Sequence, residues 1–123
     1  MIQRGDIEAI VTWVPAGSKV LDLGCGNGDL LARLSQEKHV NGLGVDIDPA
    51  NIVAAVQKGL CVIQQDIEDG LANFEDTHFD VVIFAYSLQV LERPHAVLER
   101  IVRIGKEAII TFPNFGHWRS RLS

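Results

Sequence analysis

The sequence contains few cysteines, and its histidines are scattered. Only two cysteines occur among 123 residues, and we expect both to be free thiols. Cys25 stands between two glycines, where its backbone matters more than its sulfur, and Cys61 is expected to open a strand as a small buried hydrophobic residue. None of the four histidines has metal-ligand spacing with a cysteine or a carboxylate. The sequence therefore predicts no metal site.

Basic stripes and long apolar runs are also lacking. The formal net charge is −5, so electrostatics argues against a nucleic-acid partner. The longest apolar runs have the length of strands and the N-terminus has no signal-peptide pattern, so we expect no membrane span and a cytoplasmic location. With 47% hydrophobic residues and no repeat, low-complexity tract or linker, residues 1–123 are predicted to form a single domain.

The most informative segment, residues 20–28, is a short apolar run that ends in three alternating glycines, Gly24, Gly26 and Gly28. An amphipathic stretch follows, which predicts a strand, a tight turn and a helix, with bare backbone where a ligand comes close. A dinucleotide-binding loop would have its third glycine where this chain has Asp29, and a P-loop would need Gly-Lys-Ser/Thr. Asp29 would also compete with a phosphate for the positive end of the helix. The loop is therefore either an ordinary tight turn or the cradle of a nucleoside without phosphates.

The first acidic candidate, Asp46, ends the strand predicted at 40–46 and follows Gly26 by 20 residues. A carboxylate there can accept hydrogen bonds from both ribose hydroxyls of a nucleoside that lies across the glycine loop. Asp48 has a simpler interpretation, because it is a good N-cap and the proline after it suits the first helical position. Asp46 is therefore the predicted ligand contact, together with the adjacent Ile47, and Asp48 is structural.

The second acidic candidate, Asp66, follows the strand predicted at 60–65. It either contacts the ligand or merely begins the acidic loop at 66–69. Because Asp22, Asp46 and Asp66 all fall at or near the carboxyl ends of successive strands, a shared nucleoside site is the better account of their positions.

These features together resemble the AdoMet (S-adenosylmethionine) site of class I methyltransferases. AdoMet offers an adenosine, a sulfonium cation and an amino-acid head, and it carries no phosphate. The resemblance implies that the loop residues and Asp22 hold AdoMet or S-adenosylhomocysteine. It also implies that Asp66 accepts a hydrogen bond from the adenine amino group and that the backbone N–H of Ile67 meets the ring.

The spacing of apolar residues predicts alternating helices and strands. Helices are expected near 6–14, 28–37, 49–58 and 94–104, and strands near 19–24, 40–46, 60–65, 79–85 and 107–112. Several strands lack polar alternation, as expected for a sheet covered on both faces. We predict an α/β fold: a three-layer α-β-α doubly wound parallel sheet, Rossmann-like, with the ligand over the strand ends where strands one and four part.

One part of the class I methyltransferase fold is missing from this sequence. That sheet normally ends in an antiparallel hairpin beyond strand five, whereas this chain stops at Ser123. The final run, 116–122, resembles the start of an element without a partner. We therefore expect strand five to present an uncovered edge, through which copies of the chain associate into a homo-oligomer.

Almost the whole chain, 5–121, resembles the MetW family of bacterial methionine-biosynthesis proteins. The resemblance is carried by residues 20–26, 62–66 and, most specifically, 111–119, which read Thr-Phe-Pro-Asn-Phe-Gly-His-Trp-Arg. It implies AdoMet binding and an association with homoserine O-acyltransferase, which the protein would support or regulate. Asp46 departs from the family, whose members often carry glutamate there, so its carboxylate has a shorter reach toward the ribose.

The sequence leaves the catalytic residues open. Tyr86, Glu92 and His95 could each act as an acid or a base, but each also has a structural interpretation at the end of a strand or helix. The Asn/Asp-Pro-Pro-Tyr/Phe run of enzymes that act on exocyclic amines is absent, which disfavours that substrate class. Two functions remain: an AdoMet-binding partner of the acyltransferase, or an active methyltransferase on an unidentified small molecule. A dehydrogenase ranks third because of the glycine spacing.

Overall fold

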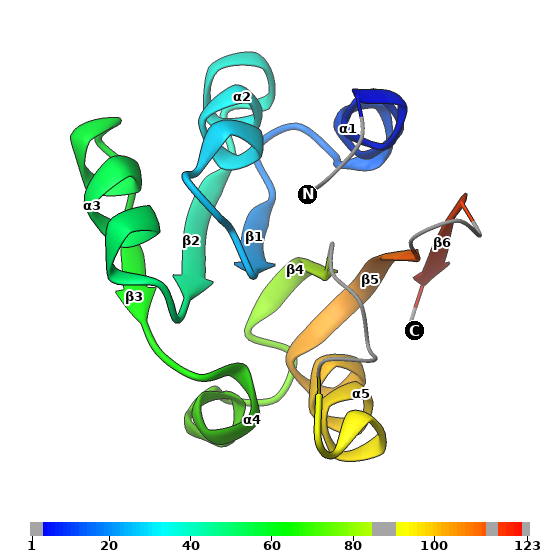
Figure 1. The fold of residues 1–123 in the computed structure, drawn as a ribbon. Helices are drawn as coiled ribbons and strands as arrows, with labels where there is room; N and C mark the ends of the chain where they lie inside the picture. The colour runs from blue at the N-terminus through cyan, green and yellow to red at the C-terminus, as the bar shows by residue number, and fades with distance from the viewer. Residues whose placement is uncertain (1–3, 85–90, 113–115, 122–123) are drawn as a thin grey trace.

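The computed structural model describes residues 4–84, 91–112 and 116–121. These residues form a six-stranded sheet in the order β3-β2-β1-β4-β5-β6, parallel from β1 to β5 and antiparallel between β5 and β6 (Figure 1). The strands are β1 (Lys19–Leu23), β2 (Asn41–Asp46), β3 (Val62–Gln64), β4 (Phe79–Phe84), β5 (Gly105–Phe112) and β6 (Gly116–Arg121). The helices are α1 (Arg4–Trp13), α2 (Asp29–Lys38), α3 (Pro49–Gln57), α4 (Ile67–Gly70), the 3-10 turn η1 (Leu71–Asn73) and α5 (Pro94–Ile104).

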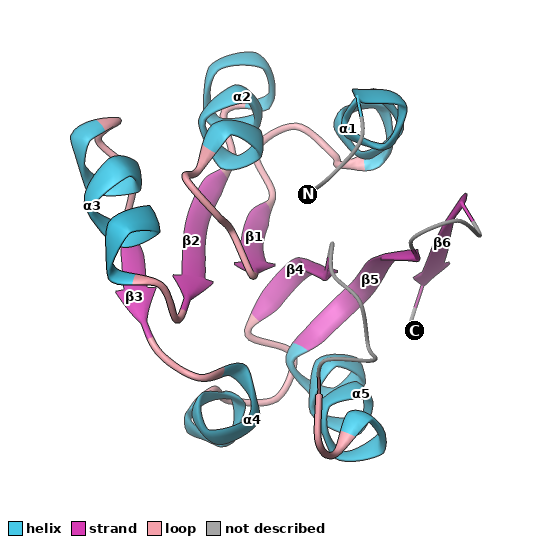
Figure 2. Cartoon of the chain, in the orientation of Figure 1, coloured by secondary structure: helices cyan, strands magenta, loops and turns pink. Residues whose placement is uncertain are grey.

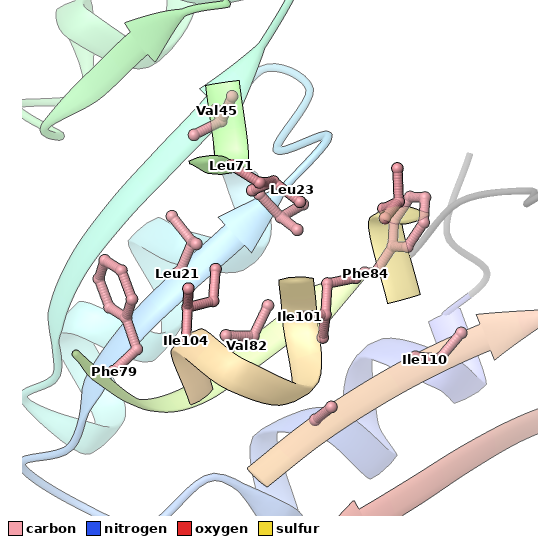
Figure 3. Close-up of a cluster of buried hydrophobic side chains, with 12 residues drawn as sticks. Leu21, Leu23, Val45, Leu71, Phe79, Val82, Phe84, Ile101, Ile104 and Ile110 are labelled. Atoms are coloured by element: carbon pink, nitrogen blue, oxygen red, sulfur yellow. The ribbon is translucent and has the colours of Figure 1, made fainter. Parts of the chain in front are cut away.

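Helices cover both faces of the sheet, with α1, α2 and α3 on one side and α4 and α5 on the other (Figures 1 and 2). Successive residues of β1 point to opposite faces, as the pleat requires. Val20 packs with Leu31 and Leu34 of α2, whereas Leu21 packs on the other face with a cluster that includes Ile101 of α5 (Figure 3). The predicted three-layer α/β fold is thus confirmed.

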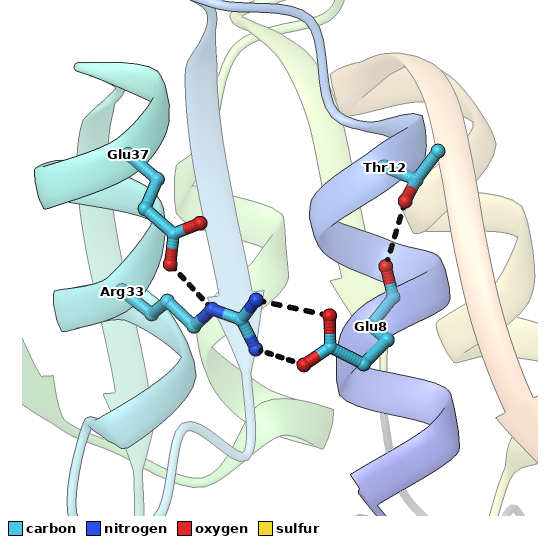
Figure 4. Close-up of polar contacts among 4 residues, drawn as sticks. All are labelled: Glu8, Thr12, Arg33 and Glu37. Atoms are coloured by element: carbon cyan, nitrogen blue, oxygen red, sulfur yellow. Dashed lines mark hydrogen bonds and ion pairs between the residues drawn. The ribbon is translucent and has the colours of Figure 1, made fainter.

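One arginine joins the first two helices. Arg33 of α2 presents its Nη1 and Nη2 atoms to the two carboxylate oxygens of Glu8 on α1, at 2.7 and 3.0 Å, and its Nε to Glu37 (Figure 4). A planar guanidinium suits this two-pronged geometry. These side chains are 32% to 57% exposed, so the ion pairs link α1 to α2 but add little stability.

The order of the strands reverses at β1, which lies between β2 and β4. Leu23, the last residue of β1, pairs with Val45 on one side and with Phe84 on the other. The carboxyl ends of three strands therefore meet at one edge of the sheet. In doubly wound sheets, ligands bind at this reversal point.

The predicted uncovered edge of strand five is wrong. β6 pairs antiparallel with β5, from Phe112 opposite Gly116 to Glu107 opposite Arg121. An antiparallel return needs only a short connection, so the few residues after β5 suffice to satisfy its edge. The sequence of β6 contains one apolar residue, Trp118, and so gives no strand pattern to predict it from.

One smaller expectation also fails: Cys61 is exposed rather than buried, because it precedes the three-residue edge strand β3. The acidic segment at 66–69, which was the alternative interpretation of Asp66, contains the single helical turn α4, and η1 follows it. A turn of four residues is too short to show a helical period in the sequence. Among the described helices, none has the length and apolar character needed to cross a membrane.

Candidate functional site

The glycine-rich loop leaves β1 in a left-handed conformation. Gly24, Gly26 and Gly28 have φ angles of 76°, 58° and 88°, a region that side chains disfavour. A Cβ on Gly26 would meet nothing within 4 Å, whereas one on Gly28 would lie 2.5 Å from Leu60 Cδ1 and 3.2 Å from Ala55 Cβ. The first two glycines therefore shape the turn, and Gly28 also lets the loop pack against α3 and the residues after it.

Backbone and carboxylate acceptors of β2 fix the loop in place. The N–H groups of Gly24 and Cys25 donate to the carbonyl oxygen of Val45 at 2.7 and 3.0 Å. The N–H of Gly26 donates to Oδ2 of Asp46 at 2.8 Å. Residues 20 positions apart in the sequence are thereby joined at the reversal point of the sheet.

Asp46 also organises the start of α3. Its Oδ1 accepts from the backbone N–H of Asp48 at 2.9 Å and from Nδ2 of Asn51 at 3.3 Å. Asp48 caps α3 by accepting from the N–H of Ala50 at 2.9 Å, so its predicted structural role is confirmed.

A lysine holds the loop from outside. Lys58, at the end of α3, donates from Nζ to the carbonyl oxygen of Asn27 at 2.7 Å and pairs with Asp29 at 3.0 Å. The hydrogen bond from Lys58 lowers the pKa of the Asp29 carboxyl. Sequence analysis did not predict this tertiary contact.

A pocket of about 480 Å³ opens over the carboxyl ends of β1, β2 and β4. It is lined by Gly24, Gly26, Asp46, Ile47, Asn51, Gln65, Asp66, Ile67, Glu68, Phe84, Leu91 and Glu92. This described lining includes four carboxylates and no lysine, arginine or histidine. It offers apolar surface for a ring and acceptors for hydroxyl or amino groups, and it opposes a polyphosphate.

Six of the nine predicted ligand residues line this pocket together: Gly24, Gly26, Asp46, Ile47, Asp66 and Ile67. Asp66 does so while capping α4, because its Oδ1 accepts from the N–H of Glu68 at 2.9 Å. The two sequence interpretations of Asp66, a pocket residue and the start of a local turn, are thus compatible. Asp22, Cys25 and Gly28 are outside the lining.

Asp22 is buried in β1, with 1% of its surface exposed. Among the described residues, no hydrogen-bond partner reaches its Oδ1. Burial, reinforced by the nearby charge of Asp46, raises the pKa of Asp22 to about 7. A buried carboxyl oxygen without a donor is costly, so it marks a place where a donor group would be favourable.

Cys25 does not provide a nucleophile. Burial, together with the charges of Asp22 and Asp46, raises the pKa of its thiol to about 12. The thiol therefore stays protonated at neutral pH, and the reactive thiolate is scarce. Cys25 instead packs on the backbone of Gly44, where an added Cβ would lie 2.8 Å from its Sγ.

Residues 4–123 match the family described as methionine biosynthesis protein MetW. The chain belongs to the MetW family. It is 40% identical, over 94% of its length, to the bifunctional methionine biosynthesis protein MetXA/MetW of Rhodopirellula baltica, of which it spans 20%. The methionine-biosynthesis assignment made from the sequence is thereby supported.

Solved structures place this MetW-family chain among class I methyltransferase folds. A TehB-like SAM-dependent methyltransferase from Corynebacterium glutamicum is 28% identical, with a TM-score of 0.73 over 93% of this chain and 65% of that protein. The [4+2]-cyclase SpnF has a TM-score of 0.76 over 86% of this chain and 43% of its own, at 18% identity. The fold is therefore shared by proteins with different chemistry.

The pocket also contains residues that sequence reasoning missed, notably Asn51, Gln65, Phe84 and Leu91. The position of Asn51 could have been predicted from the sequence, because it lies in the first turn of the helix that Asp48 was predicted to begin. Phe84 and Leu91 come from the other side of β1, and only the tertiary fold brings them to the pocket. Among the three acid–base candidates, Glu92 lines the pocket, His95 is exposed on α5, and Tyr86 is outside the described residues.

Proposed function

We propose that this MetW-family chain binds AdoMet or S-adenosylhomocysteine in the pocket over β1, β2 and β4. The ribose would lie on Asp46 and the adenine beside Asp66 and Ile67. The observation that carries this proposal is the joining of Gly26 to Asp46, since it brings a bare glycine backbone and a carboxylate to one pocket wall.

The lack of cationic residues in the described lining fits this ligand better than it fits a dinucleotide. AdoMet carries positive charge on its sulfonium and ammonium groups, whereas NAD carries two phosphates. Four carboxylates attract the first and repel the second.

Titration calorimetry with AdoMet, S-adenosylhomocysteine and NAD tests the proposal directly. We expect binding of the first two with one site per chain, and no heat from NAD. Saturable binding of NAD would reject the AdoMet site. So would the absence of binding heat with all three ligands under conditions where the chain is folded.

At the level of the pathway, the protein would act in methionine biosynthesis by supporting or regulating homoserine O-acyltransferase. The support is the relative from Rhodopirellula baltica, whose name joins MetXA and MetW in one chain. A fusion of two activities in a relative is consistent with contact between the separate proteins. By binding AdoMet, the downstream product of the pathway, the protein would sense how much of that product is available.

The second candidate function is methyl transfer to a small molecule. It is favoured by the likeness to a SAM-dependent methyltransferase and by the position of Glu92 on the pocket wall, where it could accept a proton. Production of S-adenosylhomocysteine from AdoMet in a fractionated cell extract would support this function, and its loss in a Glu92→Gln variant would assign the base.

A further inference from the structure

The hydrogen-bonding capacity of Asp46 is nearly used up by the protein itself. A carboxylate offers about four lone-pair positions, two on each oxygen. Among the described residues, three donors reach it: the N–H of Gly26 on Oδ2, and the N–H of Asp48 with the Nδ2 of Asn51 on Oδ1. One position, on Oδ2, is left for a ligand.

A ribose that donates both hydroxyl groups to Asp46 needs two positions, so one existing donor must leave. Gly26 is held within a loop that Val45 also fixes, and the N–H of Asp48 belongs to the backbone that starts α3. Asn51 is different: its bond is the longest of the three at 3.3 Å, and its amide turns on a rotatable side chain that lines the pocket. Asn51 is therefore the donor that a ligand can displace from Asp46.

We propose that Asn51 competes with the ligand's ribose for Asp46. This inference rests on the proposed function, because it takes the ribose to lie on Asp46. A nucleoside with one hydroxyl uses the remaining Oδ2 position without disturbing Asn51. A nucleoside with both hydroxyls must first displace the amide, so its second hydroxyl adds little to affinity. Asn51 therefore lowers the affinity for the complete ribose and leaves the affinity for a deoxyribose unchanged.

The test combines protein variants with a change in the ligand. Asn51→Ala removes the amide, and Asn51→Leu replaces it with an apolar side chain of similar size that cannot donate. Both are titrated by calorimetry with S-adenosylhomocysteine and with its 2′-deoxy analogue. Val53→Ala, at an exposed position of the same helix, is the matched control.

We expect Asn51→Ala and Asn51→Leu to bind S-adenosylhomocysteine about 3- to 10-fold more tightly than the parent chain, the range for the net gain from one ordinary hydrogen bond. The 2′-deoxy analogue should bind all proteins equally, within about twofold. Val53→Ala should match the parent with both ligands. Thermal melting of each variant confirms that α3 is intact.

Two results would overturn the inference while leaving the AdoMet site in place. The first is weaker binding of S-adenosylhomocysteine by both Asn51 variants, since Asn51 would then contact the ligand rather than compete with it. The second is an equal gain for the ribose and deoxyribose ligands, since the effect would then have nothing to do with the second hydroxyl. If the parent chain bound neither ligand, the proposed function would fail and this inference with it.

Discussion

Asp22 couples the stability of the folded chain to pH. Its pKa is about 7 in the folded protein, against 3.8 for an ordinary aspartate, because burial and Asp46 disfavour its charge. Between these values the folded chain holds a proton that the unfolded chain has lost, so this group's contribution to stability falls as pH rises from about 4 to 7. Well above pH 7 both states have lost the proton and no further loss is expected.

We predict that Asp22→Asn removes this dependence. Relative to the parent chain, the variant should gain about 2–4 kcal/mol of unfolding free energy between pH 4 and pH 7.5, since each pKa unit corresponds to about 1.4 kcal/mol. Urea unfolding of both proteins at several pH values measures the difference in their unfolding free energies. Titratable groups that both proteins contain contribute equally and drop out of this difference. A constant difference across this range would show that Asp22 titrates normally.

The second prediction at this scale concerns Asp46. Asp46→Ala should weaken AdoMet binding by about 1.5–3 kcal/mol, the range for hydrogen bonds to a charged group. Part of the loss would come from releasing the N–H of Gly26, which Asp46 holds at 2.8 Å. Asp48→Ala is the control, because it removes a helix cap worth about 1 kcal/mol without removing a pocket residue. Full affinity in a folded Asp46→Ala variant would exclude this residue from the site.

At the scale of elements, the glycines of the loop have different roles: Gly26 allows the turn, and Gly28 also allows close packing against neighbouring side chains. Gly28→Ala should cost about 1–3 kcal/mol of stability, because it forces a side chain into a left-handed backbone and against Leu60 and Ala55. Gly26→Ala meets no neighbouring atom, so it should cost less stability but disturb the pocket wall that it lines. Thermal unfolding and AdoMet titration of both variants separate the two effects. Equal losses of stability would contradict this difference in roles.

The elements that could be predicted from the sequence were those with a strong pattern. The parallel strands and the helices α2, α3 and α5 follow from apolar runs, and the start of α3 from Asp48 and Pro49. The turn α4 and the strand β6 were missed, since one is four residues long and the other has a single apolar residue. β6 forms against the edge of β5, a tertiary partner that local sequence does not show. α4 is a local turn capped by Asp66, and it is too short to show a helical period.

For the whole molecule, the candidate site contains two kinds of residue: some can be predicted from their spacing in the sequence, and others reach the pocket only through the tertiary fold. Gly24, Gly26 and Asp46 follow a spacing that can be read along the chain. Phe84 and Leu91 reach the pocket because the strand order places β4 beside β1. The fold alone does not fix the reaction, since a [4+2]-cyclase shares it. Function must therefore be tested through the ligand and the partner.

The last prediction is a linkage between those two. If the protein regulates homoserine O-acyltransferase, the two should form a complex whose affinity changes with AdoMet. Thermodynamic reciprocity then requires the acyltransferase to change the affinity for AdoMet by the same factor, typically about 5- to 150-fold. Calorimetry in both directions measures the two factors, and an acyl-transfer assay with and without AdoMet measures the effect on turnover. The Asp46→Ala variant should still bind the acyltransferase but lose the response to AdoMet. No complex between the purified proteins, together with methyl transfer from AdoMet in a cell extract, would instead favour the methyltransferase function.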